Sequence, residues 1–255
     1  MLIVLSPAKR LDFTEADPSQ PASERRFLED TASLARTARG RTVAELRRLM
    51  SISDDLARLN RERFQAFDPD STDGVQAVFA FAGDVYEGLK ARELDPAGLA
   101  FAQEHVRILS GLYGLLRPLD RIQPYRLEMG TRLKTRRGSS LYDFWGDRIS
   151  KCLNADAEGR GQRTLVNLAS QEYFGAIDAR ALKLPVVTPH FREAKDGESR
   201  IISFFAKKAR GGMTRFAIDE RIERAEDLKA FDRDGYRFDK ATSSETEWIF
   251  IRSGN

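Results

Sequence analysis

Short apolar stretches, each followed by a turn, are the feature that most constrains the fold of this chain. Met1 to Leu5, Val106 to Ser110 and Thr164 to Ala169 lack the alternation of apolar and polar residues that marks a strand with one face in water. Such stretches are typical of strands buried on both faces, in a sheet covered by helices. Because segments with helical spacing lie between them, we expect an α/β fold, a mixed sheet with helices on its faces.

The 255 residues contain no internal repeat and no low-complexity linker, so residues 1–255 predict a single intertwined α/β domain. Leu141 to Leu153 predicts one amphipathic helix, and a second helix starts at Ala206 and is interrupted by Gly211-Gly212. Val186 to Arg192 and Ser199 to Phe205 predict a β-hairpin with Asp-Gly in its turn.

Residues 42–64 predict two helices with a short connector, Ser51-Ile52-Ser53. Thr42 and Glu45 form a capping box at the first helix, and Ser53 caps the second. This is the layout of a helix-hairpin-helix, which binds DNA phosphates through hairpin amides and a helix N-terminus.

Two features of this hairpin favour an ordinary packed pair of helices instead. Ser51 and Ser53 stand where such hairpins prefer glycine, and Asp54 and Asp55 would repel a phosphate. Both interpretations of the lobe stay open at this point.

Basic residues gather in two stretches. Val106 to Arg137 contains eight basic and two acidic residues, and Ile201 to Arg215 contains four basic residues and no acidic one. Since the net formal charge is only +3, the rest of the chain is acidic. Charge segregated in this way indicates an anionic partner, and guanidinium groups pair well with phosphates.

Lys9-Arg10 follows the first strand, at the edge of an α/β sheet where ligands bind. We therefore predict that three segments converge into a basic cleft for duplex or branched DNA, in which Tyr125 stacks on a base. The predicted DNA contacts are Lys9, Arg10, Arg117, Arg121, Tyr125, Arg126, Arg132, Lys134, Lys207, Lys208, Arg210 and Arg215.

The alternative is an enzyme that acts on a nucleobase or a nucleotide in the same cleft, because such enzymes combine a basic groove with a polar pocket. Lys9 is its candidate nucleophile or base, paired with Glu128 or Asp84. The sequence assigns no reaction to these residues.

Other classes have little support. Two distant histidines and one cysteine, Cys152, provide no metal-binding spacing, and no Walker, dinucleotide-binding or nucleophile-elbow motif occurs, so we expect no metal and no cofactor. No tract is long enough to span a bilayer, and the N-terminus does not fit a secretory signal. We expect a cytoplasmic protein without a membrane partner, and we favour a monomer.

Long motifs of this chain resemble the YaaA family of peroxide stress proteins. They are LIVLSPAKRLDF (2–13), FAGDVYEGLKA (81–91), ILSGLYGLLRPLDRIQPYRLEMGTRL (108–133), LYDFWGD (141–147), LVNLASQEYF (165–174), VVTPHF (186–191), IISFFAKKARGGMTRF (201–216) and GYRFD (235–239).

The resemblance implies a cytosolic protein that limits peroxide damage and lowers unincorporated iron. It also implies DNA binding through a basic cleft and a helix-hairpin-helix, on a fold particular to the family. It implies no reaction.

Overall fold

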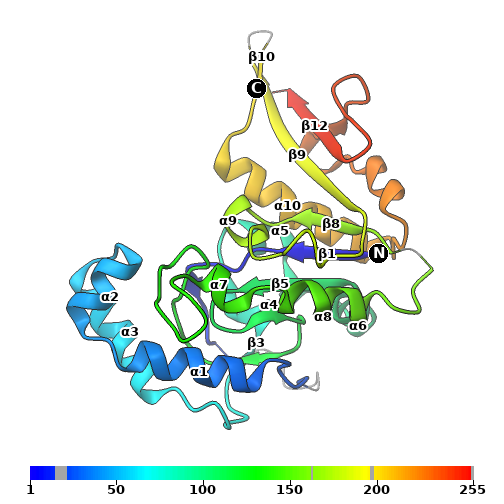
Figure 1. Ribbon diagram of the computed structural model, residues 1–255. Coiled ribbons are helices and arrows are strands. Elements are labelled where there is room, and N and C mark those ends of the chain that lie inside the picture. Colours follow the sequence, from blue (N-terminus) through cyan, green and yellow to red (C-terminus); the bar gives the residue numbers. More distant parts are fainter. Residues whose placement is uncertain (15–21, 162, 196–197, 254–255) are drawn as a thin grey trace.

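The computed structural model describes residues 1–14, 22–161, 163–195 and 198–253 (Figure 1). Its strands are β1 Leu2–Leu5, β2 Arg10–Leu11, β3 Val75–Gln76, β4 Phe81–Ala82, β5 Val106–Ser110, β6 Gly114–Leu116, β7 Arg121–Ile122, β8 Leu165–Leu168, β9 Val186–Lys195, β10 Glu198–Arg200, β11 Arg237–Phe238 and β12 Glu247–Ser253. Its α-helices are α1 Leu28–Arg39, α2 Val43–Met50, α3 Asp54–Ala66, α4 Ala77–Ala80, α5 Asp84–Leu89, α6 Pro96–His105, α7 Leu141–Trp145, α8 Arg148–Asp156, α9 Gln171–Phe174 and α10 Ser203–Asp219.

Eight of these strands form one mixed sheet. Seven follow the order β11-β12-β9-β8-β1-β5-β6, and β10 pairs with the end of β9. The pairs from β5 through β1, β8 and β9 to β12 are parallel, whereas β5/β6, β9/β10 and β11/β12 are antiparallel. The predicted α/β class with a mixed sheet is confirmed.

Strand β1 lies at the centre of this arrangement, and each of its four residues is at most 1% exposed. The chain adds β5 and β6 on one side of β1 and later returns to add β8 and β9 on the other side. In a sheet of this kind the loops diverge at the carboxyl ends of the strands where the order reverses, which leaves room for a ligand. That position lies beside β1 and β8.

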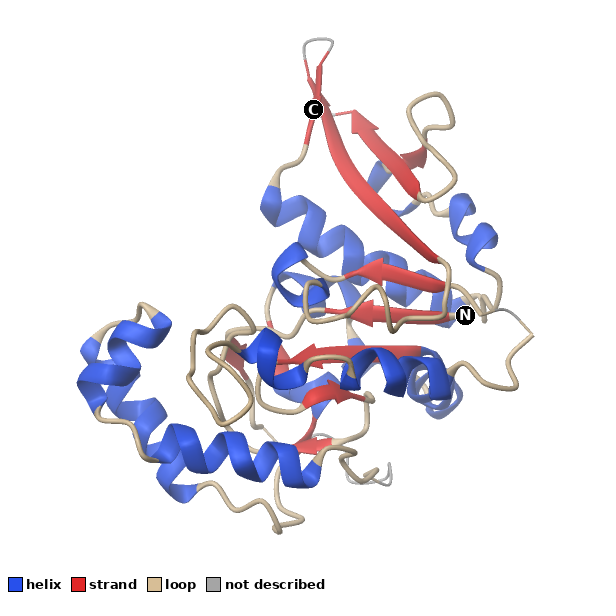
Figure 2. Ribbon diagram, viewed as in Figure 1, coloured by secondary structure: helices blue, strands red, loops and turns tan. Residues whose placement is uncertain are grey.

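Helices cover both faces of the central strands, with α7, α8 and α9 on the near side and α5 and α10 behind (Figure 2). Helices α1, α2 and α3 extend from one side of the sheet (Figure 1). Among the described residues, none of the helices combines the length and the apolar composition needed to cross a bilayer.

The helix starts predicted at Thr42 and Ser53 are confirmed, whereas the helix expected from Ala206 begins at Ser203. The Thr42 hydroxyl accepts from the Glu45 amide at 3.2 Å, and the Glu45 carboxylate accepts from the Thr42 amide at 2.8 Å. Ser53 caps α3, and Asp95 caps α6 with Pro96 as its first residue. These caps fix where each helix begins because they satisfy amides that have no partner within the helix.

Two predicted elements differ from the structure. The helix expected over residues 141–153 is broken at Gly146, whose φ of +49° and ψ of −124° no helix accommodates. The expected second hairpin strand ends at Arg200, and α10 begins at Ser203. The turn at 196–197 lies outside the described residues.

Helix α10 continues through Gly211 and Gly212, although the two glycines predicted an interruption. The reason is packing, because α5 and α10 approach each other backbone to backbone. A Cβ on Gly211 would lie 1.8 Å from the carbonyl oxygen of Val85, and a Cβ on Gly88 would lie 2.1 Å from that of Lys208. Only glycine permits this distance, so the tertiary contact outweighs the low helix propensity of the two residues.

Adding one methyl group tests this contact. Gly211→Ala forces apart two backbones that have no flexible atoms to yield, so we expect the free energy of unfolding in urea to fall by about 3 kcal/mol. Gly212→Ala is the matched control, since its Cβ would meet Phe231 at an ordinary 3.7 Å. That variant should be unchanged or up to about 1 kcal/mol more stable. Equal effects of the two substitutions would contradict the packing argument.

Candidate functional site

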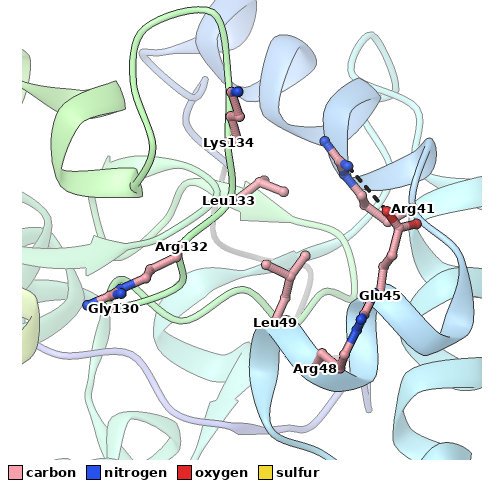
Figure 3. Close-up of a pocket in the computed structure, with 8 residues that line it drawn as sticks. All are labelled: Arg41, Glu45, Arg48, Leu49, Gly130, Arg132, Leu133 and Lys134. Atoms are coloured by element: carbon pink, nitrogen blue, oxygen red, sulfur yellow. Dashed lines mark hydrogen bonds and ion pairs between the residues drawn. The ribbon is translucent and has the colours of Figure 1, made fainter.

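A groove of about 500 Å³ lies between helix α2 and the loop that follows β7 (Figure 3). It joins the first helix of the predicted hairpin lobe to the end of the predicted basic stretch. The residues that line it are Arg41, Glu45, Arg48, Leu49, Gly130, Arg132, Leu133 and Lys134.

Three cations of this groove have no carboxylate partner. Arg48, Arg132 and Lys134 are exposed, and none of them takes part in an ion pair found within the described ranges. Arg41, in contrast, pairs with Glu45 at 3.4 Å. The groove therefore presents positive charge that is not neutralised internally, the property that binds a polyanion.

The hairpin between α2 and α3 offers less to a phosphate. Ser51 closes α2 in the left-handed conformation (φ 51°, ψ 51°), and the Ser53 hydroxyl already accepts from the Leu56 amide at 3.4 Å. Asp54, which pairs with Arg47 at 3.1 Å, places negative charge on the first turn of α3. A helix-hairpin-helix in the DNA-binding sense is not confirmed. The exposed cations of this lobe that form no ion pair within the described residues are Arg48 on the groove side of α2 and Arg58 and Arg61 on α3.

A second cavity, of about 550 Å³, opens at the carboxyl ends of β1 and β8. Ser6 directly follows β1 and Ser170 lies shortly after β8, while α5 and α10 form the opposite wall. The residues that line this pocket are Ser6, Pro7, Ala8, Lys9, Arg10, Ala82, Gly83, Asp84, Val85, Tyr86, Glu87, Ser170, Glu172, Tyr173, Lys207 and Arg210. It occupies the position that the strand order predicts for a ligand.

Segments that are distant in sequence meet at this pocket. Lys9 Nζ lies 3.1 Å from Glu128 Oε2, and Arg126 Nη2 lies 2.7 Å from the other oxygen of that carboxylate. Lys207 joins them on the pocket wall from α10. The structure thus brings together parts of all three predicted basic segments, although Glu128 neutralises some of their charge.

Other cations of the pocket are also paired. Arg10 Nη2 contacts Glu87 at 3.1 Å, and Lys207 Nζ lies 3.6 Å from Asp84. These side chains are roughly half exposed or more, except Asp84, so each pair contributes little stability. In each of these two ion pairs the charges cancel, and an incoming ligand can replace one partner at a small cost in free energy.

The three candidate catalytic residues all lie at this pocket, since Lys9 and Asp84 line it and Glu128 contacts Lys9. The Lys9 side chain is 65% exposed and ion-paired. It therefore lacks the desolvated surroundings that activate a lysine as a nucleophile.

Arg210 differs from every other cation of the pocket. It is partly buried, and within the described residues it forms no ion pair, while its Nε is buried without a hydrogen-bond partner. Burial alone lowers the pKa of its guanidinium. A buried charge without a partner is costly, so Arg210 provides a place for an anion that the protein itself does not fill.

The groove and the pocket share a wall. The amide of Gly130, which lines the groove, donates to Glu172 Oε1 at 2.9 Å, and Glu172 lines the pocket. A Cβ on Gly130 would come within 3.2 Å of that oxygen, so the two surfaces are separated by little more than one contact.

Several predicted DNA contacts have partners within the protein. Arg117 pairs with the buried Asp120 at 3.1 Å, and Arg215 pairs with Asp219 at 2.7 Å and donates to the Lys90 carbonyl. Arg121 donates to the Thr72 carbonyl at 3.1 Å. These guanidinium groups have internal acceptors, and they lie outside the groove and the pocket.

Tyr125 is a correction to the predicted contact set. Its side chain is 5% exposed, its hydroxyl lies 2.6 Å from Ser110 Oγ, and its ring packs edge to face against Tyr113. Burial raises the pKa of its phenol. A ring in the core has no free face for a base, so the stacking role is withdrawn. Lys208, in contrast, is exposed and forms no ion pair in the part of the chain that the structure describes.

Arg48, Ser170 and Glu172 are not among the site residues predicted from the sequence. Arg48 carried a signal, because it follows Arg47 on a helix that was already suspected of binding DNA. Ser170 and Glu172 carried one too, since they follow a buried strand as Lys9 does. Both residues reach the pocket only because β8 lies beside β1, and this strand order was not predicted from the sequence.

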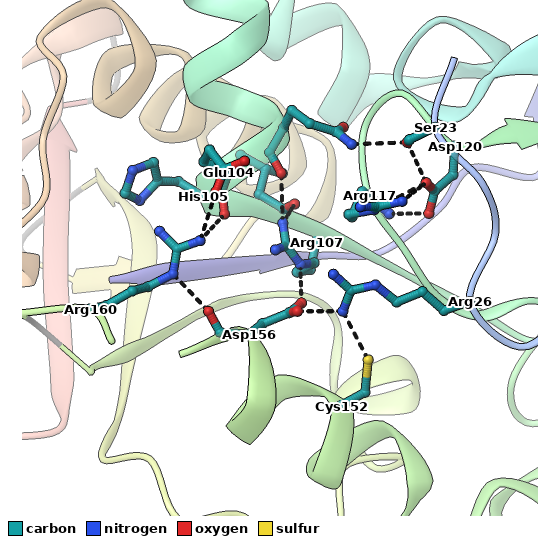
Figure 4. Close-up of polar contacts among 12 residues, drawn as sticks. Ser23, Arg26, Glu104, His105, Arg107, Arg117, Asp120, Cys152, Asp156 and Arg160 are labelled. Atoms are coloured by element: carbon teal, nitrogen blue, oxygen red, sulfur yellow. Dashed lines mark hydrogen bonds and ion pairs between the residues drawn. The ribbon is translucent and has the colours of Figure 1, made fainter. Parts of the chain in front are cut away.

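Cys152 belongs to a polar network below β5 (Figure 4). Arg26 donates to its Sγ at 3.1 Å and also pairs with Asp156, which pairs in turn with the buried Arg107. Burial raises the pKa of the Cys152 thiol, which outweighs the lowering effect of the Arg26 hydrogen bond. Within the described residues, no group of three or more His, Cys, Asp or Glu side chains is arranged to hold a metal ion.

The raised pKa predicts a slowly reacting thiol. The native protein should be alkylated by iodoacetamide at pH 7 more slowly than free cysteine, because the thiolate is the nucleophile. The rate should increase about tenfold per pH unit from 7 to 8.5, with no plateau below about pH 9. The same protein in denaturant is the control and should react like free cysteine. A plateau below pH 8 in the native protein would contradict the assignment.

Comparison with known proteins finds similar sequences along nearly the whole chain. Residues 1–242 match the family model described as peroxide stress protein YaaA. A UPF0246 protein of Phenylobacterium zucineum is 64% identical over 252 residues, covering 99% of this chain and 95% of the relative. UPF0246 proteins of Caulobacter vibrioides and Ruegeria pomeroyi are 62% and 54% identical, each covering 99% of this chain and at least 98% of its own length. The chain belongs to the YaaA family of peroxide stress proteins.

Proposed function

We propose that this protein binds DNA through the groove between α2 and residues 130–134. The observation that carries the proposal is the set of three exposed cations there, Arg48, Arg132 and Lys134, which no acid neutralises within the described residues. Arg132 and Lys134 belong to the contacts predicted from the sequence, and Arg48 is added to them.

The proposal assumes that cations without an internal carboxylate partner contribute most of the affinity for DNA. Binding to a polyanion gains free energy mainly by releasing condensed counterions, with a log–log salt slope of about −0.9 per phosphate contact on duplex DNA. An arginine that must first leave an internal carboxylate gains less. Arg117, Arg126 and Arg215 should therefore contribute little to affinity.

Charge reversal in the groove tests this function. Arg132→Glu/Lys134→Glu should weaken binding to duplex and branched DNA at least tenfold at about 0.1 M salt, because each reversal removes one phosphate contact and adds a repulsion. The salt slope should become shallower by about 2. Fluorescence anisotropy over a salt series measures both quantities.

The control is Arg224→Glu/Lys240→Glu, which changes net charge by the same amount at two exposed cations, one between α10 and β11 and one between β11 and β12, that form no ion pair within the described residues. Both sites lie far from α2 (Figure 1). If the control weakens binding as much as the groove variant, long-range charge and not the groove determines affinity, and the proposal fails.

We further propose that DNA binding is the route by which the protein limits peroxide damage and unincorporated iron, as its family resemblance implies. The raised pKa of Cys152 argues against a thiolate that consumes peroxide directly. Cells that carry only the groove variant should then contain as much unincorporated iron as cells that lack the protein. Electron paramagnetic resonance of the chelated ferric ion measures this iron. A normal level of unincorporated iron in those cells would show that iron control does not depend on DNA binding, and would contradict this proposal.

The pocket beside the groove favours a second candidate, an enzyme that acts on a nucleobase or a nucleotide. Enzymes of this class combine a basic groove for the backbone with a polar pocket for the reacting group. Incubation with damaged or modified DNA, followed by mass spectrometry, should then reveal a product. Lys9→Ala and Asp84→Asn should abolish it while DNA affinity persists. A product that survives both substitutions would remove these residues from the reaction.

A further inference from the structure

We propose that the pocket at the carboxyl ends of β1 and β8 binds a nucleoside monophosphate, with the phosphate held by Arg210. The inference deepens the second candidate function and rests on it for the class of substrate. It does not depend on DNA binding in the groove, so the two proposals can fail separately.

Arg210 requires an anion. Its side chain is partly buried and lines the pocket, its Nε has no hydrogen-bond partner, and no carboxylate lies within ion-pairing distance in the described part of the chain. Desolvation lowers the pKa of this group, but an arginine stays charged at neutral pH. The cost of the buried charge is recovered only when a ligand supplies the negative charge, and the planar guanidinium matches the oxygens of a phosphate.

The neighbouring charges favour a phosphate over a singly charged carboxylate. Lys207, one turn before Arg210 on α10, is 51% exposed and lies 3.6 Å from Asp84, a loose pair that an incoming anion can replace. A phosphate monoester carries a charge of about −1.5 to −2 at pH 7. Arg210 and Lys207 together provide the two positive charges that such a group needs.

The opposite wall supplies a hydroxyl donor. Ser6 Oγ accepts from the Ser170 amide at 2.9 Å and donates to Ser170 Oγ at 3.3 Å. Since Ser170 Oγ accepts this bond, its own proton is left for another acceptor, and no protein acceptor for it occurs among the described residues. A phosphate or sugar oxygen in the pocket can take that proton.

The remaining space suits a planar group. Tyr173 is only partly buried and lines the pocket from α9, and aromatic side chains stack on nucleobases irrespective of the base. A volume of about 550 Å³ lies in the usual range for small-molecule sites, about 300–1,000 Å³. An arginine that can hold a phosphate and an aromatic side chain in the same cavity match the chemistry of a mononucleotide.

The nucleotide has two possible sources, because the pocket adjoins the groove at the Gly130–Glu172 contact. It is either a free nucleoside monophosphate or one nucleotide of DNA bound in the groove. Both place a phosphate on Arg210, and the experiment distinguishes them.

The test is titration calorimetry of the full chain with the four 2′-deoxynucleoside 5′-monophosphates and with the matching nucleosides. Wild type should bind the monophosphates saturably and the nucleosides at least tenfold more weakly. Arg210→Gln should lose at least tenfold in monophosphate affinity, because a charge-assisted contact is removed. Arg180→Gln, at a 94% exposed arginine, is the matched control and should bind like wild type.

Two further variants protect the test against misfolding. Arg210→Lys keeps the charge and should retain part of the affinity, and Ser170→Ala should weaken binding severalfold without altering the core. Thermal unfolding in the absence of ligand confirms that each variant is folded.

A second arm uses single-stranded and duplex DNA containing 2-aminopurine. If a nucleotide of bound DNA enters the pocket, the 2-aminopurine fluorescence should change on binding in wild type and not in Arg210→Gln. If only free monophosphates bind, calorimetry is positive and the fluorescence stays unchanged. Both results support a phosphate on Arg210. The proposal for the pocket is overturned if neither the monophosphates nor the DNA shows binding that depends on Arg210. In that case, loss of duplex binding in the Arg132→Glu/Lys134→Glu variant would still support DNA binding in the groove.

Discussion

The close approach of α5 and α10 determines what the pocket can contain. Gly88 on α5 and Gly211 on α10 let the two backbones touch, at distances that any Cβ would prevent. One turn before each glycine, the same helices carry Asp84 and Lys207 on facing sides of the pocket, 3.6 Å apart. A wider separation would leave a carboxylate and an ammonium unpaired, and would expose Arg210 to solvent. The helix contact therefore sets both the width of the pocket and the unmatched charge inside it.

The centre of the fold was predictable and the distribution of its charges was not. The apolar stretches at 1–5, 106–110 and 164–169 identify buried strands, because burial on both faces leaves a composition that needs no partner information. Their order, which puts β8 beside β1 and creates the pocket, is a long-range property. The same limit applies to Gly211 and Gly212, where local propensity predicts a break and a tertiary contact maintains the helix.

Charge segregation predicted a basic surface but overestimated how many cations it holds. Arg117 lies three residues from Asp120, a neutralisation that spacing alone suggests. Arg107 and Arg137 find Asp156 and Asp30 far away in the sequence, which only the fold reveals. For Tyr125, too, only the fold reveals its surroundings. In the sequence, an aromatic residue among arginines suggests base stacking, but in the structure its ring lies in the core. The cations that stay free, such as Arg132 and Lys134, lie in the loop between β7 and α7, where no acid of the described residues pairs with them.

Differences in burial among the ion pairs explain how one protein can be both firmly folded and open to an anionic ligand. Arg107 and Asp156 are 3% and 8% exposed, and removing one partner of such a pair costs about 3–5 kcal/mol, so this pair does not exchange. Lys9 is 65% exposed, and its bond to Glu128 is worth at most about 1 kcal/mol. Glu128 keeps Arg126, which is 16% exposed, when Lys9 turns to another anion. The pocket mouth can therefore rearrange around a phosphate without disturbing the sheet, while Arg210 remains the cation whose charge only a ligand completes.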